Sequence, residues 1–161
     1  MKYTVSIELA LPRAKAVRLI ADPTTMPMWL RGLVVHEPVS GVHGEVGTRS
    51  RVVLKAGQQE FEATETIIRR EPQDLHAIPA ESVVHFEREI VGKGMWSATR
   101  DRFTEAGPET THWEQESEYR FSGVLMRLVG ALMPGSFRKQ SLAHMQDFKA
   151  FAEHGTDVRD A

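Results

Sequence analysis

The stretch that decides the fold covers residues 110–121 and reads TTHWEQESEYRF. Uncharged side chains alternate there with mostly charged ones, which is typical of a strand with one buried face and one wet face. An amphipathic helical segment follows from Val124 to Glu153, and its Pro134-Gly135 step should kink or break it. A helix that comes last must cover a sheet already built, and a curved sheet and helix can enclose a cavity.

The chain before this stretch is mostly β-patterned. Apolar and polar residues alternate in a first strand that ends at Pro12, and a helix then runs from Arg13 to Ala21. Further elements are expected as a short helix over Thr24–Leu30 and strands near Leu33–Val39, Thr48–Lys55, Glu60–Arg70, Ser82–Ile90, Met95–Thr104 and Thr110–Phe121. The pattern predicts an α+β fold, a seven-stranded curved antiparallel sheet wrapped around a long C-terminal helix.

Composition limits the function classes. The length of 161 residues predicts a single domain, here residues 1–154, with residues 155–161 as a frayed tail. The net charge of -2 argues against nucleic-acid binding, and the lack of cysteine excludes disulfides and favours a cytoplasmic location. We expect no secretion signal and no stable membrane insertion, because no apolar run approaches about 20 residues. The oligomeric state stays open.

Several motifs resemble a known family. They are Met28-Trp29-Leu30-Arg31-Gly32-Leu33, the glycines at 41, 44 and 47, Glu65-Thr66-Ile67, Phe103, Thr111-His112-Trp113, and the segment from Phe137-Arg138-Lys139 to Asp147-Phe148. With the element order, they resemble the helix-grip fold of the SRPBCC (START/Bet v 1-like) superfamily, and most closely bacterial polyketide cyclase/dehydrase-like proteins. The resemblance implies a lipid- or polyketide-like hydrophobic ligand and no cofactor. It carries over no catalytic residue, because the family has no single invariant catalytic motif.

Strand alternation predicts which residues face the cavity. Glu114 and Glu116 are plainly wet, so Arg100 and Arg102 of the preceding strand should lie opposite them on the outer face. The inward set then combines an apolar wall with a few polar groups, as ligand sites usually do. The candidate ligand-binding residues are Glu65, Phe86, Arg88, Asp101, Phe103, Trp113, Gln115 and Ser117.

Three members of this set allow alternative interpretations. Arg88 and Asp101 lie on adjacent predicted strands and could pair, either to anchor a polar group of the ligand or merely to close one end of the barrel. An inward Glu65 could have a raised pKa and act as a general acid or base. Otherwise, Glu65 is a surface residue in a salt bridge or at a bulge.

Other residues favour structural interpretations. The seven histidines show no ligand spacing, so we expect solvated surface histidines and no metal site. Trp29 should be core packing. Trp96 is outward in this register, so either the register slips at the neighbouring turn or Trp96 helps to cover the cavity rim. The apolar residues after Gly123, with Arg138-Lys139 nearby, could indicate membrane contact, but a stripe facing the core explains them more simply.

Three functions remain open. The first is a protein that binds a medium-sized hydrophobic molecule in an internal cavity between the sheet and the last helix. The second is a cyclase or dehydratase that uses acid/base residues of the cavity, which requires inward titratable groups that converge. The third is an interaction module like the chaperone activators of the superfamily, with a filled cavity and an exposed apolar patch.

Overall fold

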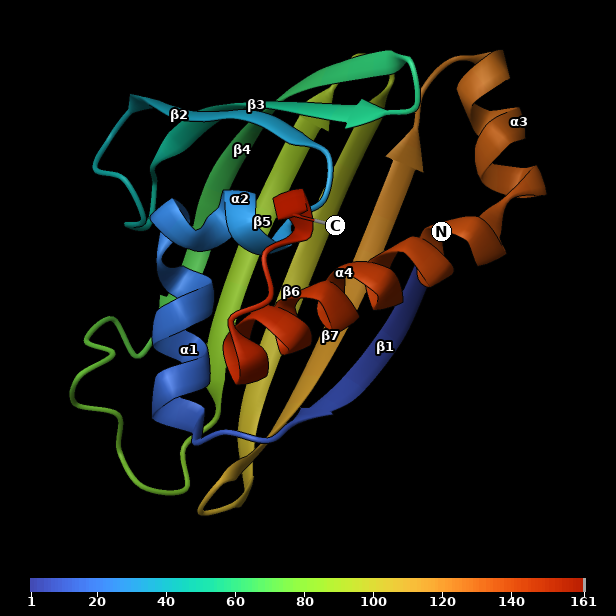
Figure 1. The fold of residues 1–161 in the computed structure, drawn as a ribbon. Coiled ribbons are helices and arrows are strands. Elements are labelled where there is room, and N and C mark those ends of the chain that lie inside the picture. Colours follow the sequence, from blue (N-terminus) through green and yellow to red (C-terminus); the bar gives the residue numbers. More distant parts are fainter. Residues whose placement is uncertain (161) are drawn as a thin grey trace.

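The computed structural model describes residues 1–160, which form one antiparallel sheet and the helices that cover it (Figure 1). The strands are β1 (Lys2–Leu9), β2 (Leu33–Ser40), β3 (Arg49–Ala56), β4 (Gln59–Glu71), β5 (Val84–Gly92), β6 (Met95–Gly107) and β7 (Thr110–Phe121). The helices are α1 (Arg13–Ala21), the 3₁₀ turn η1 (Pro23–Thr25), α2 (Met26–Trp29), α3 (Val124–Leu132), α4 (Pro134–His154) and η2 (Val158–Asp160). The strand order β1-β7-β6-β5-β4-β3-β2 confirms the predicted seven-stranded α+β fold.

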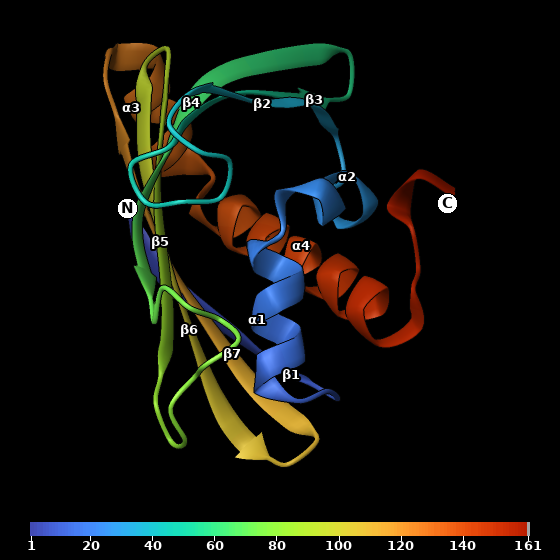
Figure 2. The same ribbon diagram turned by 90° about the vertical axis from the view of Figure 1, so that its left-hand side faces the viewer.

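The core lies between the sheet and the helices α1, α2 and α4, which share one face of the sheet (Figure 2). Trp113 stacks on Phe103 with ring centres 5.4 Å apart, and it makes a T-shaped contact with Phe148 of α4, with ring centres 5.3 Å apart. Trp29 is buried and also contacts Phe148, with ring centres 5.2 Å apart, so its predicted core role is confirmed. Together with the buried Met145, these side chains fill the space under α4 where we expected the cavity.

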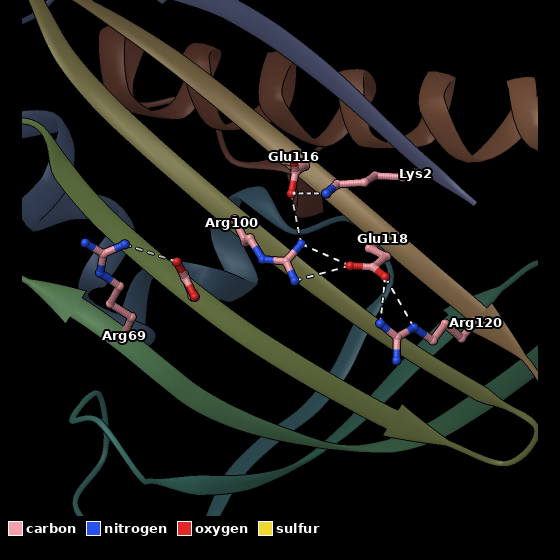
Figure 3. A network of polar contacts seen from close by, with 7 residues as sticks. Lys2, Arg69, Arg100, Glu116, Glu118 and Arg120 are labelled. Atoms are coloured by element: carbon pink, nitrogen blue, oxygen red, sulfur yellow. Dashed lines mark hydrogen bonds and ion pairs between the residues drawn. The ribbon is translucent and has the colours of Figure 1, made fainter.

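The outer face of the sheet confirms the predicted register. Arg100 is paired with Glu116 and Arg102 with Glu114, with nitrogen–oxygen distances of 2.9 and 3.8 Å. Figure 3 shows Arg100 between Glu116 and Glu118, with Lys2 and Arg120 contacting the same two carboxylates.

Trp96 is also on the outer face, opposite Arg120, so the register does not slip at the turn. The Arg120 guanidinium lies 4.4 Å from the centre of the Trp96 ring and shields it from water. A cation–π contact with Arg120 therefore explains how Trp96 can lie on the outer face. Trp96 does not cover the cavity rim.

The helical segment after Gly123 differs from the expectation. It does break at Pro134, but the apolar stripe of α3 does not face the core, since Leu125, Leu128 and Leu132 are 73%, 53% and 71% exposed. The periodicity is correct for a helix, yet the break turns α3 away from α4 and leaves that face uncovered (Figure 1).

The residues after α4 do not form the frayed tail that we expected. The chain turns at Gly155, which adopts a left-handed conformation, and returns toward α2 through η2. Val158 is only 9% exposed. The buried Val158 thus lies in a segment that contacts α2, and Ala161 lies outside the described residues.

Candidate functional site

A hollow opens between the first helices and the strands β2 to β6. Ile20 and Ala21 of α1, Pro23 of η1 and Met26 of α2 form its apolar side. The sheet contributes His36, Ser50, Glu65, Ile67, Arg69, Arg70, Phe86, Glu87, Arg88 and Asp101, and the β2–β3 loop contributes His43 and Gly44. The cavity volume is about 60 Å³, so the hollow is small and has an apolar wall opposite a charged one.

The charged wall is a continuous chain of polar contacts. His36 Nε2 lies 3.0 Å from Glu65 Oε1, and His43 Nε2 lies 3.3 Å from His36 Nδ1. Arg88 lies between the two buried carboxylates, 3.6 Å from Glu65 and 3.8 Å from Asp101. We call the five residues His36, His43, Glu65, Arg88 and Asp101 the polar cluster.

The far end of the polar cluster is tied to the core. Asp101 is 2% exposed, and its Oδ1 accepts hydrogen bonds of 2.8 Å from both Trp113 Nε1 and Gln115 Nε2. The carboxylate is therefore held in place by the neighbouring strand β7, and its Oδ2 is the atom that faces Arg88. Because Trp113 and Gln115 already donate to Oδ1, we infer that Asp101 positions Arg88 rather than contacting a ligand itself.

Strand pairing brings these residues together. Glu65 of β4 is opposite Ile90 of β5, and Arg88 is opposite Thr99 of β6, so the side chains of all three strands meet diagonally on the inner face. Register shifts lie nearby, between Ile67 and Arg69 in the β4–β5 pairing. Such irregularities bend a strand and redirect side chains beside sites.

The pKa values of the two carboxyl groups are shifted in opposite directions. Burial favours the neutral form of Glu65, but the hydrogen bond with His36 and the charge of Arg88 outweigh it and lower the pKa of Glu65. The raised pKa that we expected for an inward Glu65 is therefore wrong in direction. Burial raises the pKa of Asp101, and Arg88, Gln115 and Trp113 only partly oppose this effect.

These states determine what His36 can do. Because Glu65 is ionised and can only accept hydrogen bonds, His36 Nε2 must carry the hydrogen between them. In the neutral form of His36, Nδ1 is then the acceptor nitrogen, and it contacts Nε2 of His43. His43 is solvent-exposed on the β2–β3 loop, and a ligand that displaced it would meet a basic nitrogen held in place by a carboxylate.

The candidate residues from the sequence fall into two groups. Glu65, Phe86, Arg88 and Asp101 line the hollow. The other four lie outside that lining: Phe103 and Trp113 are core residues, Gln115 contacts Asp101, and Ser117 is buried further along β7. Their role in ligand binding stays a prediction.

Sequence reasoning missed His36 and His43. The solvated-surface interpretation is wrong for His36, whose side chain is only 7% exposed. A register shift between Leu33 and Val35 sets its face and places it opposite the buried Val52. A register shift of this kind cannot be read from the alternation of apolar and polar residues. The sequence therefore carried no clear signal that His36 faces inward.

Two further features are absent within residues 1–160. No group of three or more His, Asp or Glu side chains is arranged to hold a metal ion there. In the same part of the chain, no helix is long and apolar enough to cross a membrane.

Comparisons with known proteins agree on the family and fold. The family model described as polyketide cyclase / dehydrase and lipid transport matches residues 1–153. No curated protein sequence matches the chain.

Similar solved structures share the fold at low identity. The protein TTHA0849 from Thermus thermophilus has 15% identity and a TM-score of 0.74, covering 98% of this chain and 100% of its own. The Zhui aromatase/cyclase from Streptomyces sp. R1128 has 12% identity, a TM-score of 0.71 and coverage of 95% and 93%. Norcoclaurine synthase from Thalictrum flavum has 14% identity, a TM-score of 0.68 and coverage of 96% and 94%.

Proposed function

Because the chain belongs to the polyketide cyclase / dehydrase and lipid transport family, we propose that it binds a hydrophobic small molecule whose oxygen-bearing end contacts the polar cluster. The observation that carries this proposal is the charged wall opposite an apolar one. Arg88 offers hydrogen-bond donors, His36 offers its Nδ1 as an acceptor, and Ile20, Met26 and Phe86 offer apolar surface. Ligand sites combine these two features so that apolar contact gives affinity and a few polar groups fix orientation.

The size of the hollow adds a requirement. A cavity of about 150 Å³ holds a molecule such as benzene, and the hollow has about 60 Å³. A medium-sized ligand must therefore displace part of the wall. The β2–β3 loop is the best candidate, because His43 is exposed and Gly41, Gly44 and Gly47 have positive φ angles.

A filled hollow should lose ligand binding. We expect 8-anilinonaphthalene-1-sulfonate, an apolar dye with an anionic group, to bind the wild type saturably with a rise in fluorescence. Ala21 lines the hollow, so Ala21→Phe should weaken binding by about tenfold or more, because the added ring occupies the apolar side.

Two controls make this titration specific. Ala56→Phe adds the same ring at an exposed hairpin position, and Leu128→Ser removes exposed apolar surface from α3. Both should bind the dye as the wild type does, while circular dichroism checks that Ala21→Phe is folded. Equal dye affinity in Ala21→Phe and the wild type would contradict the proposal.

The His36–Glu65 contact favours a second candidate, an acid/base enzyme. His36 Nδ1 could take a proton from the carbon next to a carbonyl, and Arg88 could stabilise the enolate oxygen, as ring closure in a cyclase requires. The test is deuterium uptake by the ketone 2-tetralone in D₂O. An enzyme should accelerate uptake, and His36→Gln should remove the acceleration. A carrier leaves the rate unchanged.

A further inference from the structure

Helix α3 presents an apolar face to solvent. Val124, Leu125, Leu128 and Leu132 are 87%, 73%, 53% and 71% exposed, and Met133 at the helix end is 50% exposed. By helical spacing, the first four lie on one side of α3. Contiguous exposed apolar surface of this kind marks an interaction site in proteins.

The packing beneath α3 holds this face outward. Gly130 is buried against the Phe121 ring, where even a Cβ atom would lie 2.5 Å from Cδ2 of that ring. Met126 covers Gly94 in the β5–β6 turn. The inner side of the helix is thus fixed on the end of β7, and Figure 1 shows α3 beside that end, far from α1 and α2.

The chain segment that carries the apolar face is rich in positive charge. Residues 119–146 contain four cations, Arg120, Arg127, Arg138 and Lys139, and no aspartate or glutamate, although the whole chain has a net charge of -2. Arg127 lies at the edge of the apolar face by helical spacing, and the exposed Lys93 precedes Gly94. Among the ion pairs within residues 1–160, none involves Lys93, Arg127, Arg138 or Lys139.

We propose that α3 docks on the surface of a membrane that contains anionic lipids. The four exposed leucine and valine side chains would enter the boundary between headgroups and acyl chains, while the cations around them contact lipid phosphates. The contact is peripheral, because a helix of nine residues is about 14 Å long and a bilayer core is about 30 Å thick.

A second copy of the chain fits the apolar face of α3 less well than anionic lipid does, because its charge is of the same sign. A symmetric contact through α3 would bring Arg127 and its neighbours near their own copies, with no carboxylate within residues 119–146 to compensate. Like charges placed opposite each other disfavour association. Anionic lipid provides the opposite charge and an apolar layer in one partner.

Vesicle sedimentation tests this proposal with the full chain. The wild type should bind mixed vesicles of phosphatidylglycerol and phosphatidylcholine more tightly than vesicles of phosphatidylcholine alone, and salt should weaken the binding. Leu125→Ser with Leu128→Ser should reduce the partition coefficient by about tenfold or more, because the apolar contact is lost. Arg127→Gln should reduce it by about fivefold.

The matched controls change the same residue types elsewhere. Val39→Ser removes an exposed apolar side chain from β2, and Lys15→Gln removes an exposed cation from α1. Both should partition like the wild type. Absence of binding to the mixed vesicles, or wild-type binding by the double serine variant, would overturn the proposal. The proposal would also be overturned if the wild type were a dimer that does not bind vesicles, and if the double serine variant were a monomer.

Discussion

Replacing Arg88 by methionine should lower the free energy of unfolding by about 3 kcal/mol. Arg88 is the cation between two buried carboxylates, Glu65 and Asp101, whose side chains are 6% and 2% exposed. Methionine keeps the apolar length of the side chain and removes the charge, so the loss reports the uncompensated carboxylates. Urea unfolding at neutral pH gives the value from the midpoint and slope.

Arg100→Met is the matched control for this change. Arg100 also contacts two carboxylates, Glu116 and Glu118, but it lies on the outer face where water screens the charges. Its loss should stay below about 1 kcal/mol. If Arg88→Met and Arg100→Met lower the free energy of unfolding equally, water screens Arg88 as it screens Arg100. The buried polar cluster would then add no more stability than a surface ion pair.

Asp101→Asn separates charge from hydrogen bonding at the other end of the pair. Asparagine Oδ1 can still accept the bonds from Trp113 and Gln115, and Arg88 keeps Glu65 as a partner. We therefore expect a smaller loss than for Arg88→Met, about 1 kcal/mol.

Replacing Glu65 by glutamine should cost about 2 kcal/mol near pH 7, the range for hydrogen bonds to charged groups. The amide can accept a bond from His36, but it brings no negative charge to Arg88.

The pH dependence of this loss has a definite sign. The partners of Glu65 lower its pKa in the folded state below the usual value of 4.5. Ionised Glu65 thus stabilises the fold above about pH 4.5, and this contribution disappears as pH falls through the lower folded-state pKa. Unfolding free energies of the wild type and Glu65→Gln should differ most near neutrality and converge in acid. A constant difference between pH 7 and pH 3 would show that ionisation of Glu65 does not matter.

The sequence predicted the sheet well because strands β6 and β7 have unambiguous inner and outer faces. The glutamates of β7 and the arginines of β6 can only face water together, and this fixed the inward position of Asp101. The diagonal contact between Arg88 and Asp101 follows from the same pattern. The order of elements and the break at Pro134 were also readable, because proline and glycine act locally.

The remaining errors arise where tertiary contacts override a local pattern. An apolar stripe has the same spacing whether it faces a core or a partner, so α3 was placed wrongly. His36 reaches the hollow only because of the irregular β2–β3 pairing. The direction of the Glu65 pKa shift depends on His36 of β2 and Arg88 of β5, which no single-strand pattern can supply.

The most direct test of the polar cluster as a ligand anchor compares two molecules of the same shape. 2-Tetralone and tetralin share one ring system, and only tetralone has a carbonyl oxygen. We predict that the wild type binds tetralone about tenfold more tightly, and that this preference disappears in Arg88→Met, because a hydrogen bond from a charged donor is lost. Equal affinities in the wild type, or a preference that survives in Arg88→Met, would contradict the account.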